Sequence, residues 1–167
     1  MSIACGHLRE ALLSKAAQNR ALGRYVALDQ GPLTIETVKQ QLSDIGVEAY
    51  ICSIRKLFGS RRDELGKFDF IYSSGLFDYL ADSTGSRLLE VIFQMLNPGG
   101  KVCITNFVPG IYTAGYMEAI MDWWLIFRDE QAMQQLTSRI PRSQIAQQRI
   151  FHEDNQNVLF LEIEKVG

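Results

Sequence analysis

Short apolar runs that alternate with longer amphipathic stretches constrain this sequence more than any other feature. The apolar runs lie at residues 2–6, 25–29, 47–52, 68–73 and 101–107. Several of them are apolar without a clean alternation, as expected for strands of a parallel sheet that is covered on both faces. The segments between them repeat apolar residues every three or four positions, as amphipathic helices do. Strand and helix in turn predict βαβ units and a doubly wound α/β sheet.

The predicted helices have recognisable ends. For the second helix, Thr34 is a candidate N-cap and Gly46 is a natural C-terminal stop. In the first helix, the spacing places one apolar face on Leu8, Leu12, Leu13 and Ala16. The helices are expected at residues 8–19, 33–45, 54–65, 87–96 and 116–136, the last with a break near Arg128-Asp129.

The end of the chain departs from the strand–helix alternation. Polar residues 153–157 separate two strand-like runs, 148–152 and 158–164, which predicts a β-hairpin. The second run is interpreted as a strand buried on both faces. We therefore expect one three-layer domain over residues 1–167, with a mostly parallel seven-stranded sheet and an antiparallel C-terminal hairpin. Met1 lies only a few residues before Gly6, so the first strand is expected to be truncated and residues before Met1 to be missing.

Net charge and cysteine content restrict the partners and the compartment. The formal net charge is −2, which gives no overall attraction to nucleic acid or to acidic membranes. The one basic cluster has acids beside it and is interpreted as a solvated helix face. No apolar run is long enough to span a bilayer, and the first residues do not show the basic and then apolar pattern expected of a signal peptide. Three scattered cysteines favour a reducing, cytoplasmic location over a disulfide framework or a zinc site. The cluster consists of Arg55, Lys56, Arg61 and Arg62.

Three strand ends carry candidate binding residues. The loop around Gly6 leads from a strand into a helix, where backbone N–H groups can approach a ligand; it is also compatible with an ordinary turn. Asp29 closes the next strand at the distance where nucleotide-binding folds place a ribose-binding acid; alone, it could be a cap. Ser73 and Ser74 end the fourth strand with small polar side chains that leave room for a ligand, or form a capped loop.

An aromatic group in the last third of the chain is a further candidate. It could line a substrate pocket, but its helical spacing favours a place in the core for Trp123 or Trp124. His7 and His152 are too far apart in the sequence to suggest a metal site, and no catalytic triad can be assembled. The aromatic group consists of Tyr112, Tyr116, Trp123, Trp124 and Phe127, with Arg128 at its end.

Taken together, these motifs resemble the class I S-adenosylmethionine-dependent methyltransferase family. The sequence SIACGHLRE at residues 2–10 resembles the first motif, and VALD at 26–29 resembles the second-strand motif. Residues 68–80 resemble the fourth motif, and LNPGGKVCI at 96–104 resembles the Pro-Gly-Gly turn and fifth strand. The closing hairpin is similar to the family's reversed last strand. In finer detail the sequence resembles a bacterial subgroup labelled as making an extracellular 3-hydroxypalmitic acid methyl ester signal.

The resemblance implies S-adenosylmethionine as cofactor and a role for each matched residue. It implies that the backbone of Ala4, Cys5 and Gly6 holds the methionine part. It implies that Asp29 binds the ribose with Gln30 near the adenine, that Ser53 and Ile54 flank the adenine, and that Ser73 and Ser74 line the methyl end. Ser2, Ala4 and Leu8 depart from the family pattern, since the first replaces an acid and the others replace glycines. Alanine at position 4 costs little provided that its φ is negative.

Three functions remain open at this stage. The first is methyl transfer to a small-molecule or lipid-like acceptor, with an oxygen or a carboxylate favoured. No general base can be identified, and Tyr79, Tyr112, Tyr116 and His152 are only candidates. The second is a non-catalytic domain that senses the cofactor or binds a partner, and a homodimer is compatible with either. The third is a nicotinamide-dependent dehydrogenase, which the Pro-Gly-Gly turn and terminal hairpin disfavour.

Overall fold

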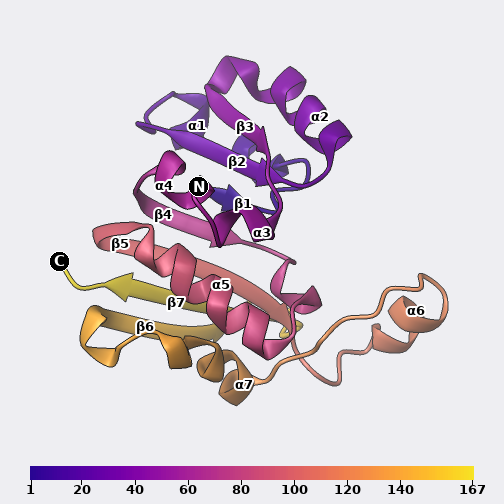
Figure 1. Ribbon diagram of the computed structural model, residues 1–167. Coiled ribbons are helices and arrows are strands. Elements are labelled where there is room, and N and C mark those ends of the chain that lie inside the picture. Colours follow the sequence, from indigo (N-terminus) through magenta and orange to yellow (C-terminus); the bar gives the residue numbers. More distant parts are fainter.

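A seven-stranded sheet with the order β3-β2-β1-β4-β5-β7-β6 organises the structure. The computed structural model describes all residues from Met1 to Gly167 (Figure 1). The first five strands are parallel, and β7 and β6 add an antiparallel hairpin at one side. The predicted α/β fold is therefore confirmed. The strands are β1 Ser2–Ile3, β2 Tyr25–Asp29, β3 Val47–Ile51, β4 Phe68–Ser73, β5 Leu96–Phe107, β6 Ile145–His152 and β7 Val158–Lys165.

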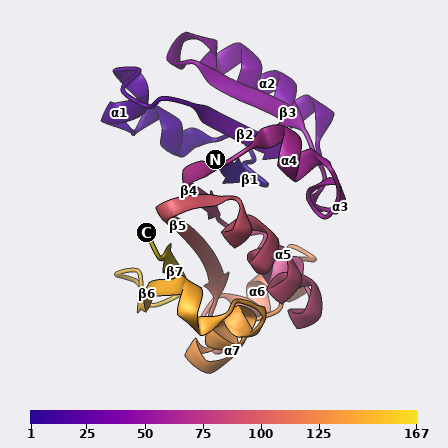
Figure 2. The same ribbon diagram turned by 60° about the vertical axis from the view of Figure 1, so that its left-hand side comes forward.

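Helices cover the two faces of the sheet unequally. One face carries α3, α4, α5 and α7, and they share a large apolar core with the sheet. The other face carries the 3₁₀ turn η1, α1 and α2, which cover only the side formed by β1, β2 and β3 (Figures 1 and 2). The helices are α1 Lys15–Gln18, α2 Pro32–Leu42, α3 Ile54–Leu57, α4 Arg61–Leu65, α5 Asp82–Gln94, α6 Ala114–Ala119 and α7 Glu130–Gln135; the 3₁₀ turns are η1 Arg9–Leu12, η2 Ser43–Ile45, η3 Phe77–Tyr79, η4 Leu136–Arg139 and η5 Arg142–Gln144.

Half of the second sheet face has no helix over it. Phe70 on β4 is 46% exposed and Phe151 on β6 is 36% exposed, although both lie on strands. Along β7, Leu159 and Leu161 are fully buried, whereas Phe160 between them is only half-buried. The interpretation of this strand as buried on both faces is therefore wrong, because only its α5-side face meets a helical layer.

Three predicted helices are broken into shorter pieces, and the one expected over residues 54–65 forms α3 and α4. Residues 8–19 form η1 and α1 with a break at Leu13, and the Ser14 hydroxyl accepts from Ala17 N at the start of α1. The predicted apolar face is wrong at Leu12, Leu13 and Ala16, which are all exposed, and Ala17 is buried instead. The helix predicted over residues 116–136 is also interrupted, and the interruption covers residues 120–129 instead of only the predicted break near Arg128-Asp129. It consists of α6 and α7 with irregular chain between them.

The second helix begins earlier than the sequence pattern predicts. Gly31 is its N-cap and Pro32 its first residue, so Thr34 lies inside the helix and is not the cap. Proline suits this position because the first N–H groups of a helix have no partner within it. Gly46 ends the following 3₁₀ turn with φ 77°, which confirms it as the stop.

Candidate functional site

The predicted binding residues meet in a row at the carboxyl edge of the sheet. Ile3 pairs with Leu28, and Asp29 pairs with Ile51, so the segments that follow β1, β2 and β3 leave the sheet side by side. The Ser73 hydroxyl donates to Ile3 O at 2.8 Å and joins the end of β4 to the same row. In open α/β sheets ligands bind at this edge, where the winding of the chain reverses.

Asp29 connects two of the loops in this row. Its Oδ2 accepts from Gly6 N at 3.0 Å, and its Oδ1 accepts from Gly31 N at 2.8 Å. The side chain is only half-buried. A carboxylate can accept about four hydrogen bonds, so each oxygen keeps capacity for a further donor. The loop contacts thus fix the carboxylate in place and leave it able to accept a ligand's hydroxyl groups.

The loop after β1 has an unusual backbone conformation. Ala4, Gly6 and Leu8 all have left-handed φ values, of 52°, 53° and 49°. The condition that alanine keeps a negative φ at position 4 is therefore not met, and residues with a Cβ are strained in this region. Leu8 offsets its strain by packing, since only 1% of it is exposed. At Gly6 no heavy atom lies within 4 Å of the position that a Cβ would take, so the loop is open on that side.

We expect opposite effects from exchanging alanine and glycine in this loop. Ala4→Gly removes backbone strain and should leave the free energy of unfolding unchanged or raise it by up to about 1 kcal/mol. Gly6→Ala introduces the same strain and should lower the free energy of unfolding by about 1–2 kcal/mol. Urea denaturation of the two variants measures both values. A loss of stability in Ala4→Gly similar to that in Gly6→Ala would contradict the left-handed conformation at position 4.

The two serines after β4 differ in what their side chains can reach. Ser73 is buried and its hydroxyl is engaged by Ile3 O, so its side chain does not face the open edge. Ser74 is exposed and lies 3.5 Å from the Thr105 hydroxyl, which also accepts from Gly75 N at 3.3 Å. Thr105, which the sequence reasoning missed, therefore belongs to this end of the row together with Ser74.

The remaining predicted residues contribute in different ways. Gln30 is exposed beside Asp29, and Ser53 is half-buried before α3, where its side chain makes no capping bond. Ile54 packs against the core. Burial, followed by the charge of Asp29, raises the pKa of Cys5 to about 12, so its thiol remains protonated at neutral pH. Only the backbone of Cys5 is suited to contact a ligand.

A buried polar network next to the row was not foreseen from the sequence. Arg128 is 1% exposed and donates through Nη1 to Phe77 O and to Asn106 Oδ1, both at 2.7 Å. Asp78 is also buried, and its Oδ1 accepts from Phe107 N at 2.8 Å. Desolvation raises the pKa of Asp78, and the Phe107 N–H and Arg128 oppose that rise. The network fixes η3 to the carboxyl end of β5.

The aromatic residues after β5 are not core residues. Trp124 is 65% exposed and Trp123 is half-buried, so the expectation that one of them lies in the core is wrong. Trp123 instead packs edge-on against Phe107, with ring centroids 6.1 Å apart, and its indole N–H donates to the Tyr79 hydroxyl. Residues 120–129 are irregular, so the helical spacing of the two tryptophans does not decide which of them is buried.

A large cavity lies on the uncovered half of the sheet and ends at the same edge. Its volume is about 610 Å³, and it runs along β4 from Lys67 and Asp69 to Ser74 and Thr105. Asp29 and the Gly6 loop do not line it. The edge of the sheet thus has two adjoining parts, namely the row around Asp29 and the mouth of this cavity.

Other kinds of site are not supported by the side-chain arrangement. His7 is exposed, and His152 lies 3.7 Å from Glu130 on the opposite side of the sheet from α1. No three His, Cys, Asp or Glu side chains are grouped as a metal site. The basic cluster is exposed or half-buried and paired in part with its own acids, as predicted for a solvated face. None of the helices has the length and apolar character needed to cross a membrane.

Comparison with solved structures relates almost the whole chain to proteins of similar fold. A protein from Bordetella parapertussis, described as a possible exported protein, has a TM-score of 0.77 at 14% identity over 99% of this chain. Magnesium protoporphyrin IX methyltransferase from Synechocystis with bound S-adenosylhomocysteine has a TM-score of 0.68 at 12% identity over 98%. Human N-acetylserotonin methyltransferase with S-adenosylmethionine has a TM-score of 0.68 at 16% identity over 99%. The chain spans 61%, 71% and 47% of these three proteins.

Comparison of sequences gives the family. A search of curated proteins found no match. A family model described as a methyltransferase domain matches residues 1–104, which include the Gly6 loop, Asp29 and the end of β4. More than half of the chain lies within this match. The chain therefore belongs to the methyltransferase domain family.

Proposed function

We propose that this domain binds S-adenosylmethionine and transfers its methyl group to an acceptor. The observation that carries the proposal is the Asp29 carboxylate, fixed by Gly6 N and Gly31 N and still able to accept. A ribose presents two adjacent hydroxyl donors to such a carboxylate. The open left-handed Gly6 loop beside it offers backbone to the rest of the cofactor. The row of residues thus offers hydrogen-bonding groups of the kind that the cofactor requires.

The residues assigned to the cofactor follow the order of the strands. Ala4, Cys5 and Gly6 would hold the methionine part through their backbone, and Asp29 the ribose. Gln30, Ser53 and Ile54 would flank the adenine, and Ser73 and Ser74 would lie at the methyl end. Because the Ser73 hydroxyl is already engaged, Ser74 is the side chain available there.

The chemistry that these residues must perform is mainly orientation. The cofactor, when bound, supplies an activated methyl group on a sulfonium. The protein aligns the acceptor with that group and excludes water. Burial raises the pKa of Cys5, Cys52 and Cys103 above the ordinary value, so none of these thiols is a ready nucleophile. We therefore propose direct transfer to the acceptor, without a methylated enzyme intermediate.

We further propose an oxygen acceptor on a small or lipid-like molecule, either a hydroxyl or a carboxylate. A carboxylate needs no general base, and no base is evident beside Ser74. The sequence's likeness to the 3-hydroxypalmitic acid methyl ester subgroup supports the same acceptor class. A cytoplasmic location and a homodimer belong to the proposal as well; the three unpaired cysteines suit a reducing compartment.

Isothermal titration calorimetry with S-adenosylhomocysteine tests the proposal directly. We expect saturable binding to one site per chain. NAD is titrated in parallel because a nicotinamide-dependent dehydrogenase is the competing hypothesis. We expect NAD not to bind. Absence of S-adenosylhomocysteine binding at millimolar concentration, with the protein folded by circular dichroism, would contradict the proposal.

A non-catalytic, cofactor-sensing or partner-binding domain is the second candidate. The observation that favours it is the left-handed conformation of Ala4 and Leu8, where residues with a Cβ adopt a backbone conformation that favours glycine. This candidate predicts binding of S-adenosylhomocysteine without turnover. Radiolabelled S-adenosylmethionine incubated with pooled small-molecule extracts separates the two, because only an enzyme transfers the label.

A further inference from the structure

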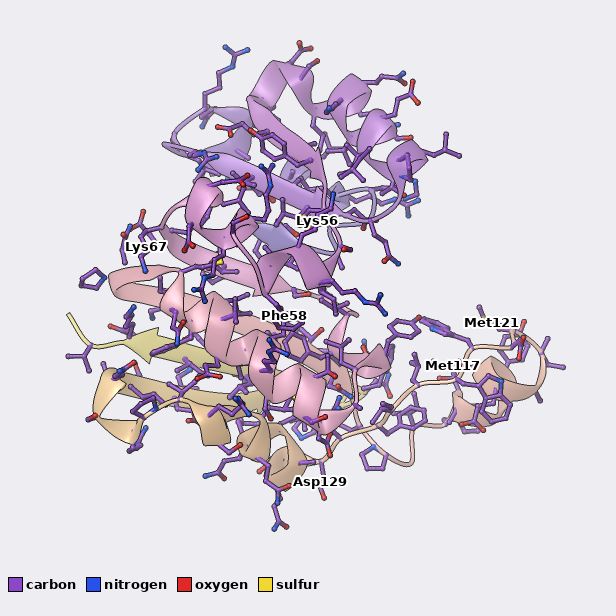
Figure 3. All side chains as sticks on the ribbon, viewed as in Figure 1. Lys56, Phe58, Lys67, Met117, Met121 and Asp129 are labelled. Atoms are coloured by element: carbon purple, nitrogen blue, oxygen red, sulfur yellow. The ribbon has the colours of Figure 1, made fainter.

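The chain between β5 and α7 forms an arm that stands away from the sheet. Residues 109–127 leave the end of β5, form α6 and return to the body at Arg128 (Figure 1). In Figure 3, Met121 lies far out on this arm, and Asp129 lies where the chain rejoins the body. The base of the arm is closed, because Arg128 N donates to Phe107 O at 3.0 Å. Its two limbs are also joined, since Trp123 N donates to Met117 O at 2.9 Å.

The arm exposes far more apolar surface than a solvated loop needs. Contiguous exposed apolar side chains on a folded protein usually mark a binding surface. The largest are Tyr112, which is fully exposed, and Tyr116, Ile120, Met121 and Trp124, which are between 53% and 70% exposed.

One aromatic side chain of the arm faces the site instead of solvent. Trp123 packs on Phe107 and donates to Tyr79, and Tyr79 belongs to η3, which follows the Ser73–Gly75 segment. Phe107 lies two residues beyond Thr105, so both point to the same face of β5. Thr105 lines the mouth of the 610 Å³ cavity. Trp123 does not itself line the cavity, but its contact residue Phe107 is two residues along β5 from the lining residue Thr105. This places the indole near the end of the row assigned to the transferred methyl group.

The charge around this mouth restricts what can bind. Residues 102–127 contain no Lys or Arg and carry two acids, Glu118 and Asp122. Arg128 is buried, and its guanidinium is engaged by backbone and side-chain acceptors. The cations that line the cavity, Arg24 and Lys67, are at its other end, about 20 Å away along β4 at roughly 3.3 Å per residue. Arg149 on β6 lies over the Phe151 ring and 3.8 Å from Glu162, so its charge already has a partner. A carboxylate or phosphate at the mouth would therefore find no free cationic partner.

We propose that the arm is the specificity element of this domain, with Trp123 its contact to the acceptor, and that the acceptor is a large, ring-containing apolar molecule without negative charge. This inference rests on the proposed function and narrows its oxygen acceptor to a hydroxyl. The hydroxyl oxygen would take the methyl group as the bond from methyl to the sulfonium breaks, and the hydroxyl proton would pass to solvent, since no base is evident beside Ser74. A flat ring would lie against the indole of Trp123 and the phenol ring of Tyr79, two aromatic surfaces suited to stacking. The exposed side chains of the outer arm would then cover the acceptor.

Both tryptophans of the chain lie on the arm, which makes its binding directly measurable. The probes are Prodan, an uncharged naphthalene dye, and anilinonaphthalene sulfonate, an anionic one. On tryptophan excitation, energy transfer to Prodan should saturate, and the sulfonate should bind at least about tenfold more weakly, as expected for a charge without a partner. Trp123→Ala should weaken Prodan binding about fivefold or more, as expected for one lost aromatic contact. Trp124→Ala, the matched control on the exposed neighbour, should change it less than about twofold.

Equal effects of the two tryptophan variants, or equal binding of the two dyes, would overturn the proposal. Calorimetry with S-adenosylhomocysteine on the same proteins separates this result from failure of the proposed function. If S-adenosylhomocysteine binds normally but the two dyes bind equally, only the proposed role of the arm is contradicted. If S-adenosylhomocysteine does not bind to the unmodified chain, the proposed function is contradicted. Trp123→Ala should leave S-adenosylhomocysteine affinity unchanged, because the indole contacts Tyr79 and Phe107 and not the Asp29 row.

Discussion

Arg128→Met is expected to lower the free energy of unfolding by about 3–5 kcal/mol, the largest stability effect that we predict. The substitution keeps an unbranched side chain but removes the donors that Phe77 O, Leu80 O and Asn106 Oδ1 accept. Those acceptors are left without partners in the interior, and each such loss costs about 1–3 kcal/mol. Urea denaturation followed by circular dichroism measures the change.

Arg139→Met is the matched control for this experiment. Arg139 is 52% exposed and pairs with Glu90 at 2.8 Å. The control variant therefore makes the same arginine-to-methionine change at the surface. A surface pair of this kind contributes about 0–1 kcal/mol. A difference of less than about 1 kcal/mol between the two variants would show that the Arg128 network does not stabilise the fold. A lower m-value for Arg128→Met alone would indicate that the arm is already loosened in the native state.

The parallel part of the fold could be predicted from the sequence because each strand has a local signal. The strands over residues 25–29 and 68–73 were predicted with the bounds that the structure has. Their apolar runs end at a polar residue or a turn, and both properties are visible in a few consecutive residues. The residues of the candidate site could also be selected from such local signals. The sheet order brings the strand ends together, so Asp29 and the Gly6 loop could be selected without knowing any contact.

What the sequence pattern could not predict depends on long-range packing. Leu12 and Leu13 fit a helical stripe, but a stripe does not reveal whether a layer exists to cover it. The alternation of burial along β7 has the same origin, because no helix covers that half of the second face. The aromatic arm is the clearest case. Trp123 and Trp124 have helical spacing, yet the chain there is irregular, and Trp123 finds its partners on β5 and η3.

The Arg128 network was missed for a different reason. An arginine is expected at the surface, and its burial becomes favourable only when enough acceptors surround it. Those acceptors come from separate parts of the chain, namely the carbonyls of Phe77 and Leu80 at η3, the carboxylate of Asp82 on α5 and the amide oxygen of Asn106 on β5. A weak signal was present, since Arg128 is the first basic residue after Lys101.

Asp29→Asn is expected to weaken S-adenosylhomocysteine binding more than tenfold, the largest effect on binding that we predict. Hydrogen bonds to a charged acceptor contribute about 1.5–3 kcal/mol, and the amide offers one acceptor oxygen instead of two. Calorimetry measures the dissociation constant. The variant also removes an acceptor from Gly6 N or from Gly31 N, so a loss of affinity could arise from the loop itself.

A comparison of two ligands separates these causes. Adenosine carries both ribose hydroxyls, and 2′,3′-dideoxyadenosine carries neither. If Asp29 binds the ribose, the unmodified chain should prefer adenosine by about tenfold or more, and Asp29→Asn should lose most of that preference. If Asp29 only holds the loop, both ligands should weaken equally and the preference should persist. Asp44→Asn, an exposed acid on η2, serves as the charge-matched control and should change neither affinity. The ribose assignment therefore depends on the change in preference and not on the loss of affinity, because only a carboxylate in contact with the hydroxyls distinguishes the two ligands.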